Sequence, residues 1–499
     1  MRHPRLSFAP LPLGTLLLGT LLLGVPAAAQ PFEAIYGPAN TVDQGARRVR
    51  PVTLCPGGGF IAVGTTNSGA AGSQVYVVRT DAAGVSLWEN AYDLGGGNQD
   101  EGRALAEIFD GTGFVILGNN ASGASWQAVL LRIGCNGNVV WTQNYRWPAF
   151  APSVRGTDLI ETRFGDASQG TAAGDFAVSG YVTTAGNEDA FLLRTRSNGT
   201  PIWNRAYRLG GQERFNALTE ATPSYGAPMG DLVAAGSVSV GTDSQALVAR
   251  VDGNNGLFGG PNRCFSNYGN ADDLQTFFSV IELQTAPHAG HLAFGGLTHG
   301  AAYSDDIYLL RTQANVCMPV VQARLGDQNQ PNQVDREIAL DLREVLQPLA
   351  GPGLPPVGSL VLTGDVADLP FTMADVPLVA VEPGNFNLLF GRIFGSQLPW
   401  TEVAFSLERI PISPDGTING YVIAGFSTSD HQGSGDPRDL YLIATDGNLD
   451  TPCSRLYQPR MTPLPWPVNY HDPTSYQPAI ANPVATIRSG LDTDFPVCP

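Results

Sequence analysis

Glutamate recurs at one position of a repeated apolar run, and this series is the first candidate for chemistry. Its members are Glu107, Glu161, Glu220, Glu282 and Glu344, with Glu408 fitting to within one residue. A ring of carboxylates near a central channel could bind a cation or protonate a glycoside. A catalytic group acts on one substrate and is usually unique. A residue repeated in register is therefore better explained by the same pairing role in every repeat.

Two further polar series recur downstream of each glutamate. A polar residue opens the next apolar run at Gln74, Gln127, Asp189, Gln245, Asp306, Asp375 and Asp439. Arginine then recurs within that run at Arg79, Arg132, Arg194, Arg250 and Arg311. A side-chain amide or carboxylate at the start of a strand usually caps loop amides, so we expect structural roles for the polar series as well.

The segment 446–450 has the first three ligand spacings of a calcium loop, with Asp446, Asn448 and Asp450 at alternate positions. It lacks the glycine at position six and the glutamate at position twelve, where Thr451 and Tyr457 stand. It also falls where a turn between two strands needs Asp, Asn and Gly. Calcium at this turn is the weak metal candidate, and we expect no other cofactor.

Histidines converge in one stretch only, at His288, His291 and His299. No cysteine or carboxylate stands at a recognised spacing from them, so surface or turn histidines are the simpler interpretation and a transition-metal site the alternative. Together with the Asp446 turn and the proline-rich C-terminal segment, this region interrupts the repeat. We expect an asymmetric site, if the protein has one, to involve one of these three places.

Composition excludes several mechanisms. The chain contains no lysine, which excludes Schiff-base, pyridoxal-phosphate and P-loop chemistry. The formal charge is −17, and it becomes −19 when Arg2 and Arg5 are removed with a leader peptide. A nucleic-acid partner is disfavoured, because binding to phosphate depends on clustered basic charge.

The first residues have the layout of a secretory signal peptide, with Arg2 and Arg5, an apolar run from Leu13 to Val25 and three alanines before Gln30. The run is too short to span a bilayer. We expect residues 1–29 to be removed, and the mature chain to be periplasmic or secreted, monomeric and without membrane insertion. In an oxidising compartment, an even number of cysteines suggests up to three disulfides among Cys55, Cys135, Cys264, Cys317, Cys453 and Cys498.

A short apolar run ending in glycine occurs seven times along the chain. The glycines are Gly64, Gly118, Gly180, Gly236, Gly296, Gly364 and Gly425. The glutamate run precedes six of the copies, with a weaker counterpart at Val49 to Leu54 before the first. A second apolar run, which carries the arginine in five repeats, follows each copy, and a Trp-x-x-x-Tyr run comes next at Trp88, Trp141 and Trp203. Short apolar runs at a period of 53 to 69 residues indicate one four-stranded antiparallel sheet per repeat. The fold class predicted is all-β, a seven-bladed β-propeller of four-stranded blades over residues 30–458.

The fourth run occurs once too often, because Phe32–Tyr36 matches it before the first repeat and Cys453–Tyr457 follows the last. One of the two is expected to close the ring, and we favour pairing of Phe32–Tyr36 with the sheet formed by residues 400–446. We expect the Trp88, Trp141 and Trp203 rings to pack between neighbouring sheets. Residues 459–499 are rich in proline, which should break regular elements and leave an extended segment strapped across the propeller.

The run from Tyr76 to Trp88 resembles the strand, turn and tryptophan pattern of bacterial secreted β-propeller repeats, including those of the quinoprotein-like family. The resemblance covers nearly all of residues 31–458 and implies the fold. Quinone-dependent members of that family carry adjacent cysteines and a calcium carboxylate cluster. This chain has no adjacent cysteines, so the quinone cofactor is not implied.

The function expected from these features is a non-catalytic binding scaffold that contacts a protein or glycan through loops on one face. Extra residues fall in loops at 301–305, 369–374 and 427–436, which is how propellers acquire partners. The first alternative is an extracellular polysaccharide hydrolase or lyase with acidic residues at the channel mouth. Another is a structural part of an envelope assembly.

Overall fold

The computed structural model describes most of residues 31–451 and, beyond them, the backbone of short strands between Arg455 and Pro496. It leaves out 1–30, the loop segments 38–41, 68–71, 96–98, 124, 147–152, 185, 224–229, 242, 259–262, 270–272, 301–302, 314–318, 327–335, 350–352, 368–373, 395–400, 412–419 and 429–437, and parts of 452–499. The signal-peptide prediction and the three insertion loops therefore lie largely outside the described residues. No described helix is long and apolar enough to cross a membrane.

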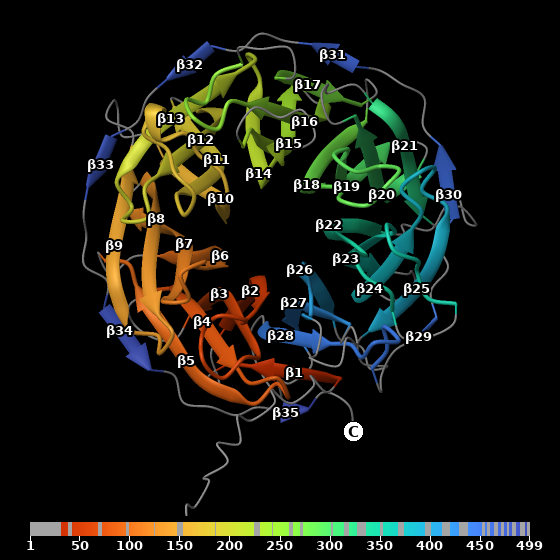
Figure 1. Ribbon diagram of the computed structural model, residues 1–499, viewed down its shortest axis with the longest axis horizontal. Helices are drawn as coiled ribbons and strands as arrows, with labels where there is room; N and C mark the ends of the chain where they lie inside the picture. Colours follow the sequence, from red (N-terminus) through yellow and green to blue (C-terminus); the bar gives the residue numbers. More distant parts are fainter. Residues whose placement is uncertain are drawn as a thin grey trace, which may run out of the picture.

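The strands of residues 32–444 fall into groups of four that share one order (Figure 1). The first strand of each group lies innermost, and the fourth lies outermost. The first strands are β2 Val42–Pro51, β6 Asp100–Glu107, β10 Ser153–Glu161, β14 Gln212–Glu220, β18 Leu274–Glu282, β22 Arg336–Glu344 and β26 Glu402–Arg409. The second are β3 Phe60–Asn67, β7 Gly113–Ser122, β11 Phe176–Thr184, β15 Leu232–Val240, β19 Leu292–Gly300, β23 Leu360–Ala367 and β27 Tyr421–Ser427.

The third and fourth strands complete each group. The third are β4 Gln74–Thr80, β8 Ser125–Gly134, β12 Asn187–Thr195, β16 Asp243–Val251, β20 Tyr303–Thr312, β24 Ala374–Val381 and β28 Asp439–Ala444. The fourth are β5 Ser86–Asp93, β9 Val139–Arg146, β13 Pro201–Arg208, β17 Cys264–Tyr268, β21 Pro319–Gly326, β25 Leu388–Phe394 and, from the start of the chain, β1 Phe32–Tyr36. One short 3-10 helix, η1 Ala167–Gln169, lies in a loop.

Neighbouring strands within every group are antiparallel, so the prediction of an all-β chain built from four-stranded antiparallel sheets is confirmed. Three groups, beginning at β14, β18 and β22, are joined into one larger mixed sheet. The joins are single parallel bridges, Ser244 to Leu274 and Asp305 to Arg336. The arrangement is a propeller-like β fold, with buried apolar residues on both faces of the middle strands.

Each innermost strand carries a β-bulge, and this bulge explains the repeated glycine. The register of the first and second strands shifts by one residue beside Gly102, Gly156, Phe215, Phe277, Ala339 and Ala404, and also beside Ala46. The repeated glycine of the second strand lies opposite the bulge. A Cβ there would overlap a carbonyl oxygen of the bulged strand at Gly64, Gly180, Gly236, Gly296, Gly364 and Gly425. Only glycine fits such a close approach of two backbones.

The first strand of the chain belongs to the last group, because β1 pairs antiparallel with β28 from Phe32 opposite Ala444 to Tyr36 opposite Leu440. The predicted pairing of Phe32–Tyr36 is thus observed. The other terminal run does not end the last repeat as expected. Its residues form β29 Arg455–Leu456, which pairs with β25 in the preceding group, because β1 already occupies the edge of β28.

Aromatic residues of the fourth strands join neighbouring sheets, as predicted for Trp88, Trp141 and Trp203. Trp88 Nε1 donates to the Cys135 carbonyl at 3.3 Å, and Trp203 Nε1 donates to the Gly253 carbonyl at 2.9 Å. The Trp141 ring lies 6.4 Å from Phe176 in the next sheet. Trp203 is buried, whereas the other two rings are half-buried and pack against inter-sheet cores.

The tyrosines of the same strands repeat one contact with the next sheet. Each hydroxyl donates to a glycine carbonyl in the following turn, at 2.7 Å for Tyr92 and Tyr145 and 2.8 Å for Tyr207. Tyr36 in β1 makes the same contact with Gly84 in the first group. The contact between the last group and the first is therefore of the same kind as the contacts between consecutive groups.

The C-terminal segment adds one short outer strand to each group. These strands are β29, β30 Arg460–Pro463, β31 Val468–Tyr470, β32 Thr474–Tyr476, β33 Ala479–Ala481, β34 Thr486–Ser489 and β35 Phe495–Pro496. They pair in turn with β25, β21, β17, β13, β9, β5 and β1, so the segment follows the rim in the reverse of chain order (Figure 1). The expectation that prolines would break regular structure is wrong here. Strands of two to four residues form at the sheet edges, and Pro463 and Pro496 stand at the ends of two of them.

One disulfide joins the first two groups. Cys55 and Cys135 are bonded, with their Cα atoms 5.6 Å apart, and link the loop after β2 to the turn after β8. Cys264 is also disulfide-bonded. The remaining candidates, Cys317, Cys453 and Cys498, lie outside the described residues, so the prediction of a disulfide framework is confirmed for Cys55 and Cys135 and for the bonded state of Cys264.

Candidate functional site in the central channel

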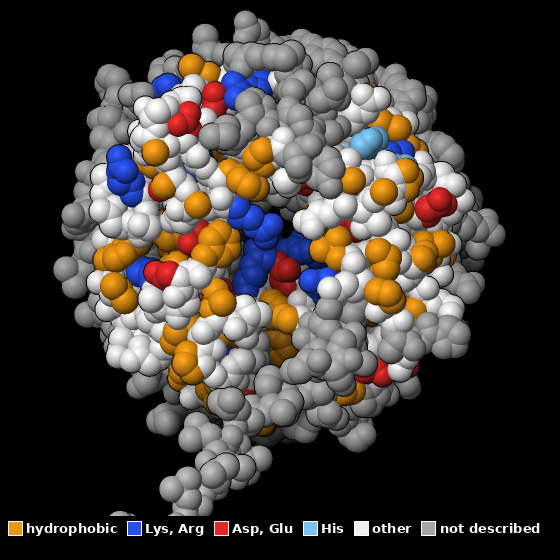
Figure 2. All heavy atoms as spheres, in the orientation of Figure 1, with side chains coloured by type: hydrophobic (Ala, Val, Ile, Leu, Met, Phe, Trp, Pro, Cys, Tyr) orange, Lys and Arg blue, Asp and Glu red, His pale blue; other side chains and the backbone are white. Residues whose placement is uncertain are grey.

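The innermost strands surround a central channel, and the bulge sets which residues face it. The bulged residues are half-buried, whereas their immediate neighbours are mostly buried. These residues are Arg47, Arg103, Thr157, Asn216, Phe278, Leu340 and Phe405. Figure 2 shows basic side chains gathered in the central hollow, and all of them are arginines because the chain contains no lysine. We call the end where the innermost strands begin the arginine end and the opposite end the glutamate end.

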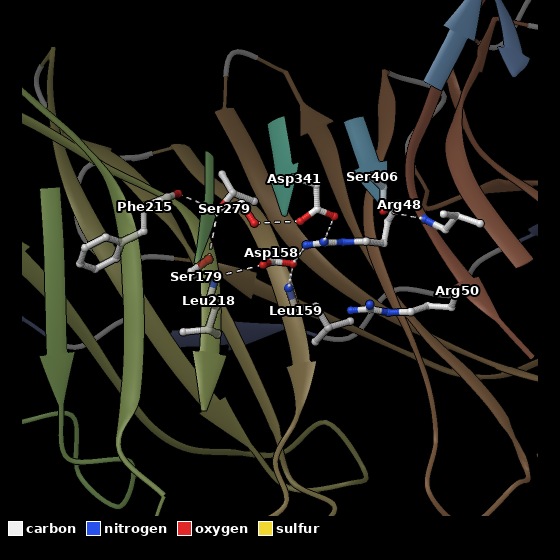
Figure 3. Close-up of polar contacts among 12 residues, drawn as sticks. Arg48, Arg50, Asp158, Leu159, Ser179, Phe215, Leu218, Ser279, Asp341 and Ser406 are labelled. Atoms are coloured by element: carbon white, nitrogen blue, oxygen red, sulfur yellow. Dashed lines mark hydrogen bonds and ion pairs between the residues drawn. The ribbon is translucent and has the colours of Figure 1, made fainter. Parts of the chain in front are cut away.

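Arg48 crosses the middle of the channel (Figure 3). It comes from β2, forms an ion pair with Asp158 of β10, and places Nη1 3.4 Å from Asp341 Oδ2 of β22. The two aspartate side chains are only 4% and 2% exposed. Three strands that are not neighbours are thereby held by one guanidinium, which plugs the channel.

Both aspartates bind main-chain groups of further sheets. Asp158 accepts from Leu218 N of β14 at 3.0 Å. Asp341 accepts from Leu407 N of β26 at 3.0 Å, from the Ser279 hydroxyl of β18 at 2.8 Å and from Arg343 Nη1 at 2.6 Å. Burial alone would raise the pKa of Asp341, but Arg343 and Arg48 hold it below its usual range. The carboxylate therefore stays ionised at neutral pH.

The next layer toward the glutamate end balances its charges in the same way. Arg343 Nη2 lies 2.6 Å from Glu408 Oε1, and Arg50 pairs with the same carboxylate. Burial, followed by the charges of Arg48 and Arg343, lowers the pKa of Arg50 to about 9, so it remains protonated at neutral pH. Arg48, Arg50 and Arg343 thus face three carboxylates, Asp158, Asp341 and Glu408. We call these six residues the channel plug, and its formal charge is zero.

The repeated glutamates lie at the glutamate end and serve as joints between sheets. All of them except Glu408, which belongs to the plug, accept main-chain N–H groups from the loop of the preceding sheet. Glu107 binds Leu54 N and Cys55 N, both at 2.9 Å. The same role recurs at Glu161 for Phe109 N, at Glu220 for Arg163 N and Phe164 N, at Glu282 for Thr222 N, and at Glu344 for Gln284 N and Thr285 N. This agrees with the structural interpretation of the series.

A cavity of about 390 Å³ opens at the glutamate end. Repeated glutamates line it, together with Arg50 and Arg163. Burial raises the pKa of Glu161 and of Glu220 to about 7, although the main-chain donors oppose this shift. The cavity therefore contains carboxyl groups that are partly protonated at neutral pH, and every one of them repeats in register around the channel.

At the arginine end, two arginines share one carboxylate. Arg103 Nη2 lies 2.5 Å from Glu101 Oε2, and Arg155 Nη1 lies 3.7 Å from the same oxygen. Arg47 stacks on Phe405, with its guanidinium carbon 4.0 Å from the ring centroid. Among the described residues, no hydrogen-bond acceptor or carboxylate contacts the Arg47 guanidinium.

The Asp446 turn is built by its own main chain. Asp446 Oδ1 accepts from Asn448 N at 2.8 Å and from Asp450 N at 3.0 Å, as Asp81 does in the corresponding turn of the first group. Within the described part of the chain, no group of three or more His, Cys, Asp or Glu residues could hold a metal ion. The contacts are those of a turn, and calcium binding here stays a prediction.

Two of the three candidate histidines lie close together, because both are hydrogen-bonded to the same arginine. Arg311 Nη1 donates to Nδ1 of His288 at 2.8 Å and to Nδ1 of His291 at 2.9 Å. Because a guanidinium cannot accept, both rings are neutral with the proton on Nε2. Burial, and then the charge of Arg311, lowers the pKa of both histidines. His299 instead contacts Asp305, with Nδ1 2.8 Å from Oδ1.

The two remaining polar series have structural contacts. In the group of Arg194, the repeated arginine donates to oxygens of the loop after the innermost strand: Arg194 Nη2 bonds the Phe164 carbonyl at 2.7 Å and the Ala172 carbonyl at 3.0 Å. In the corresponding loop of its own group, Arg311 bonds the two imidazoles instead. Among the residues that open the third strand, Gln127, Asp189 and Gln245 do not cap loop amides as expected. They accept from the adjacent fourth strand, for example Gln127 from Asn144 Nδ2 at 3.0 Å and Asp189 from Arg208 Nε at 2.8 Å.

The channel plug was missed by sequence reasoning, which placed asymmetry only at the histidines, the Asp446 turn and the proline-rich segment. The available signal was small. Asp158 and Asp341 replace Ala or Ser at one position of the innermost strand, where Arg48 stands in the first group. Nothing in the chain sequence indicates that these three residues from non-adjacent sheets meet, because their contact depends on the ring arrangement.

Comparisons with known proteins give a distant structural likeness. No family model matches the sequence, and no curated protein matches it. Two crystal structures of Sqt1 from Chaetomium thermophilum are similar, with TM-scores of 0.42 and 0.41 and 9% sequence identity in both cases. Each alignment covers 84% of this chain, and 98% or 99% of Sqt1. Similarity of this degree does not extend to function.

Proposed function

We propose that the chain is a closed seven-bladed β-propeller that is exported and acts as a non-catalytic binding scaffold. The pairing of β1 with β28 and the contact of Tyr36 with Gly84 support closure, because they repeat between the last and first groups what other neighbours show. The disulfide between Cys55 and Cys135 supports folding in an oxidising compartment, the periplasm or the exterior.

One observation carries the scaffold proposal. The repeated glutamates are occupied by main-chain N–H groups of the neighbouring sheet, and the centre of the channel is filled by a charge-balanced plug. Polar groups with these partners hold sheets together and leave no general acid with a distinct partner. A protein or glycan partner then binds at the two channel ends and at the loops.

The experiment is a glycan array and a pull-down with the mature chain, residues 30–499. The loops at 301–305, 369–374 and 427–436 are shortened one at a time to a glycine-serine turn. We expect a specific partner whose binding is lost with one of these loops. Binding that is unchanged in all three variants would contradict recognition through the loop face.

The glutamate end favours one second candidate, a polysaccharide hydrolase. A carboxyl group whose pKa lies at about 7 is suited to a general acid, and Glu161 and Glu220 both line the 390 Å³ cavity. Release of reducing ends from acidic and neutral polysaccharides, abolished in Glu161→Gln and Glu220→Gln, would establish this alternative and reject the scaffold.

A further inference from the structure

At the arginine end of the channel, the positive charges of three arginines are not all balanced by nearby carboxylates. Arg47, Arg103 and Arg155 come from three consecutive sheets, on β2, β6 and β10. One carboxylate, Glu101, lies within 4 Å of Arg103 and Arg155. Arg214 of the following sheet does not add to the excess, because it pairs with Glu188. Three guanidiniums against one carboxylate leave a local formal charge of +2.

This excess contrasts with the molecule as a whole, whose formal charge is −17. The side chains of Arg103 and Arg155 are 28% and 23% exposed, so they line the channel at its surface and are not enclosed. A positive focus inside a low-dielectric ring attracts small anions more strongly than the same charges on an open surface.

Aromatic rings hold two of the guanidiniums in place. Arg47 lies over Phe405 at 4.0 Å, and Arg155 lies over Trp126 at 3.7 Å. Stacking uses the flat face of a guanidinium and leaves its N–H edges for acceptors. Burial, with Arg103 as the next cause, lowers the pKa of Arg47 to about 10, and the Glu101 carboxylate opposes this shift.

We propose that the arginine end binds an oxyanion, either a free one or the terminal group of a larger acidic ligand, between Arg47, Arg103 and Arg155. Glu101 already shows the geometry of one such contact, because a carboxylate oxygen sits between Arg103 and Arg155. Paired N–H edges suit carboxylate, phosphate and sulfate groups. The channel plug around Arg48 lies next to this site on the side of the glutamate end. A bound ligand therefore cannot pass further along the channel.

The proposal rests on the scaffold function and names the chemistry of one of its binding surfaces. The test uses the mature chain, residues 30–499, in isothermal titration at constant ionic strength set with sodium chloride. Inorganic phosphate and sulfate form one arm, and acetate and trigalacturonate form the other. We expect saturable binding in at least one arm. Preference for phosphate or sulfate assigns a tetrahedral oxyanion, and preference for the uronate assigns a carboxylate.

Three variants separate binding from folding. Arg47→Gln should weaken binding about tenfold or more, since a hydrogen bond to a charged group is lost. Glu101→Gln should tighten it severalfold, because the competing carboxylate is removed, and damage to the fold would not produce a gain. Arg196→Gln, an exposed arginine in the turn between β12 and β13, is the matched control and should change binding less than twofold.

Absence of saturable binding to every probe, or equal effects of Arg47→Gln and Arg196→Gln, would overturn the proposal. An unchanged or weaker affinity in Glu101→Gln would do the same, even if Arg47→Gln proved too unstable to study. The scaffold proposal fails independently, when no loop variant alters capture of a protein or glycan.

Discussion

The two neighbouring layers of the channel use arginine in opposite ways. One residue past the bulge, Arg48 is held by Asp158 and Asp341 in the closed centre of the ring. At the bulge itself, Arg47 lies over an aromatic ring with no carboxylate among its described contacts. The two residues are adjacent in the sequence. A shift of one position thus separates a structural arginine from one that is available to a ligand.

The difference follows from the cost of burying charge. An ion removed from water needs both a partner and further hydrogen bonds, and the plug supplies them from five other innermost strands. A half-exposed guanidinium keeps part of its hydration and tolerates imperfect pairing. Charge balance is therefore strict in the middle of the channel and relaxed at its end.

Removing a plug carboxylate should produce the largest effect. Asp341→Ala leaves Arg48 with one carboxylate instead of two and takes the acceptor from Leu407 N and the Ser279 hydroxyl. We expect the free energy of unfolding to fall by about 3–5 kcal/mol, as for other buried ion pairs that lose one partner. Urea unfolding followed by tryptophan fluorescence measures the change.

The matched variant at the arginine end is Glu101→Gln. Its side chain is partly exposed, and its loss should change the free energy of unfolding by less than about 1 kcal/mol. A similar loss of stability in Asp341→Ala and Glu101→Gln would remove the distinction between the two layers.

The bulge that separates the layers can be tested through the glycine opposite it. In Gly425→Ala the new Cβ would overlap the Val403 carbonyl, so the strand pair must move apart. We expect a loss of about 1–3 kcal/mol in the free energy of unfolding, the usual cost of overpacking a core. Thermal unfolding by circular dichroism measures it. Gly134→Ala is the control, because its nearest contact is the end of the Asn136 side chain at 3.1 Å.

An unchanged melting temperature in Gly425→Ala would show that the second strand can shift away from the bulge without cost. The repeated glycine would then need another explanation. A large loss in the Gly134→Ala control would instead indicate a general sensitivity of these sheets to added side chains.

The parts of the fold that repeat were predictable from the sequence. Seven glycine-terminated runs fixed the strand order, and Trp203 and Tyr207 at equal spacing from them indicated the contacts between sheets. These contacts are local in each repeat unit, so the same pattern gives the same structure every time. The β-bulge is the reason for the repeated glycine. The glycine was visible in the sequence, whereas the bulge that requires it was not.

The parts that occur once were not predictable. Arg48, Asp158 and Asp341 meet only because the ring brings non-adjacent strands together, and no spacing along the chain encodes such a contact. The C-terminal strands were also missed, since strands of two to four residues in a proline-rich segment give no periodic signal. The histidines looked asymmetric, yet Arg311 uses His288 and His291 where other groups use loop oxygens.

The glutamate end sharpens the comparison, because the net pKa shift of Glu220 is opposite to that of Asp341. Burial raises the pKa of Glu220 to about 7, because Arg194 and Arg163 offset burial less completely than Arg343 and Arg48 do at Asp341. The unfolded chain should have the usual glutamate pKa, about 4.3. Between these two pH values the folded state binds more protons than the unfolded state, so Glu220 lowers stability as the pH rises through this window.

The smallest expected effect is therefore on the pH dependence of stability. Glu220→Gln keeps an acceptor for Arg163 N and Phe164 N but cannot ionise. Wild type should lose on the order of 1 kcal/mol more than the variant when the pH is raised from 5 to 8, the shift being reduced by partial exposure to solvent. Urea unfolding at both pH values measures the difference. Glu344→Gln, a repeated joint residue outside the cavity, is the control for loss of the joint itself.

If the free energy of unfolding of Glu220→Gln and of wild type changes equally with pH, the Glu220 carboxyl group ionises normally in the folded state. The glutamate end would then resemble the charged plug, and burial that nearby arginines do not fully offset would not be what distinguishes it.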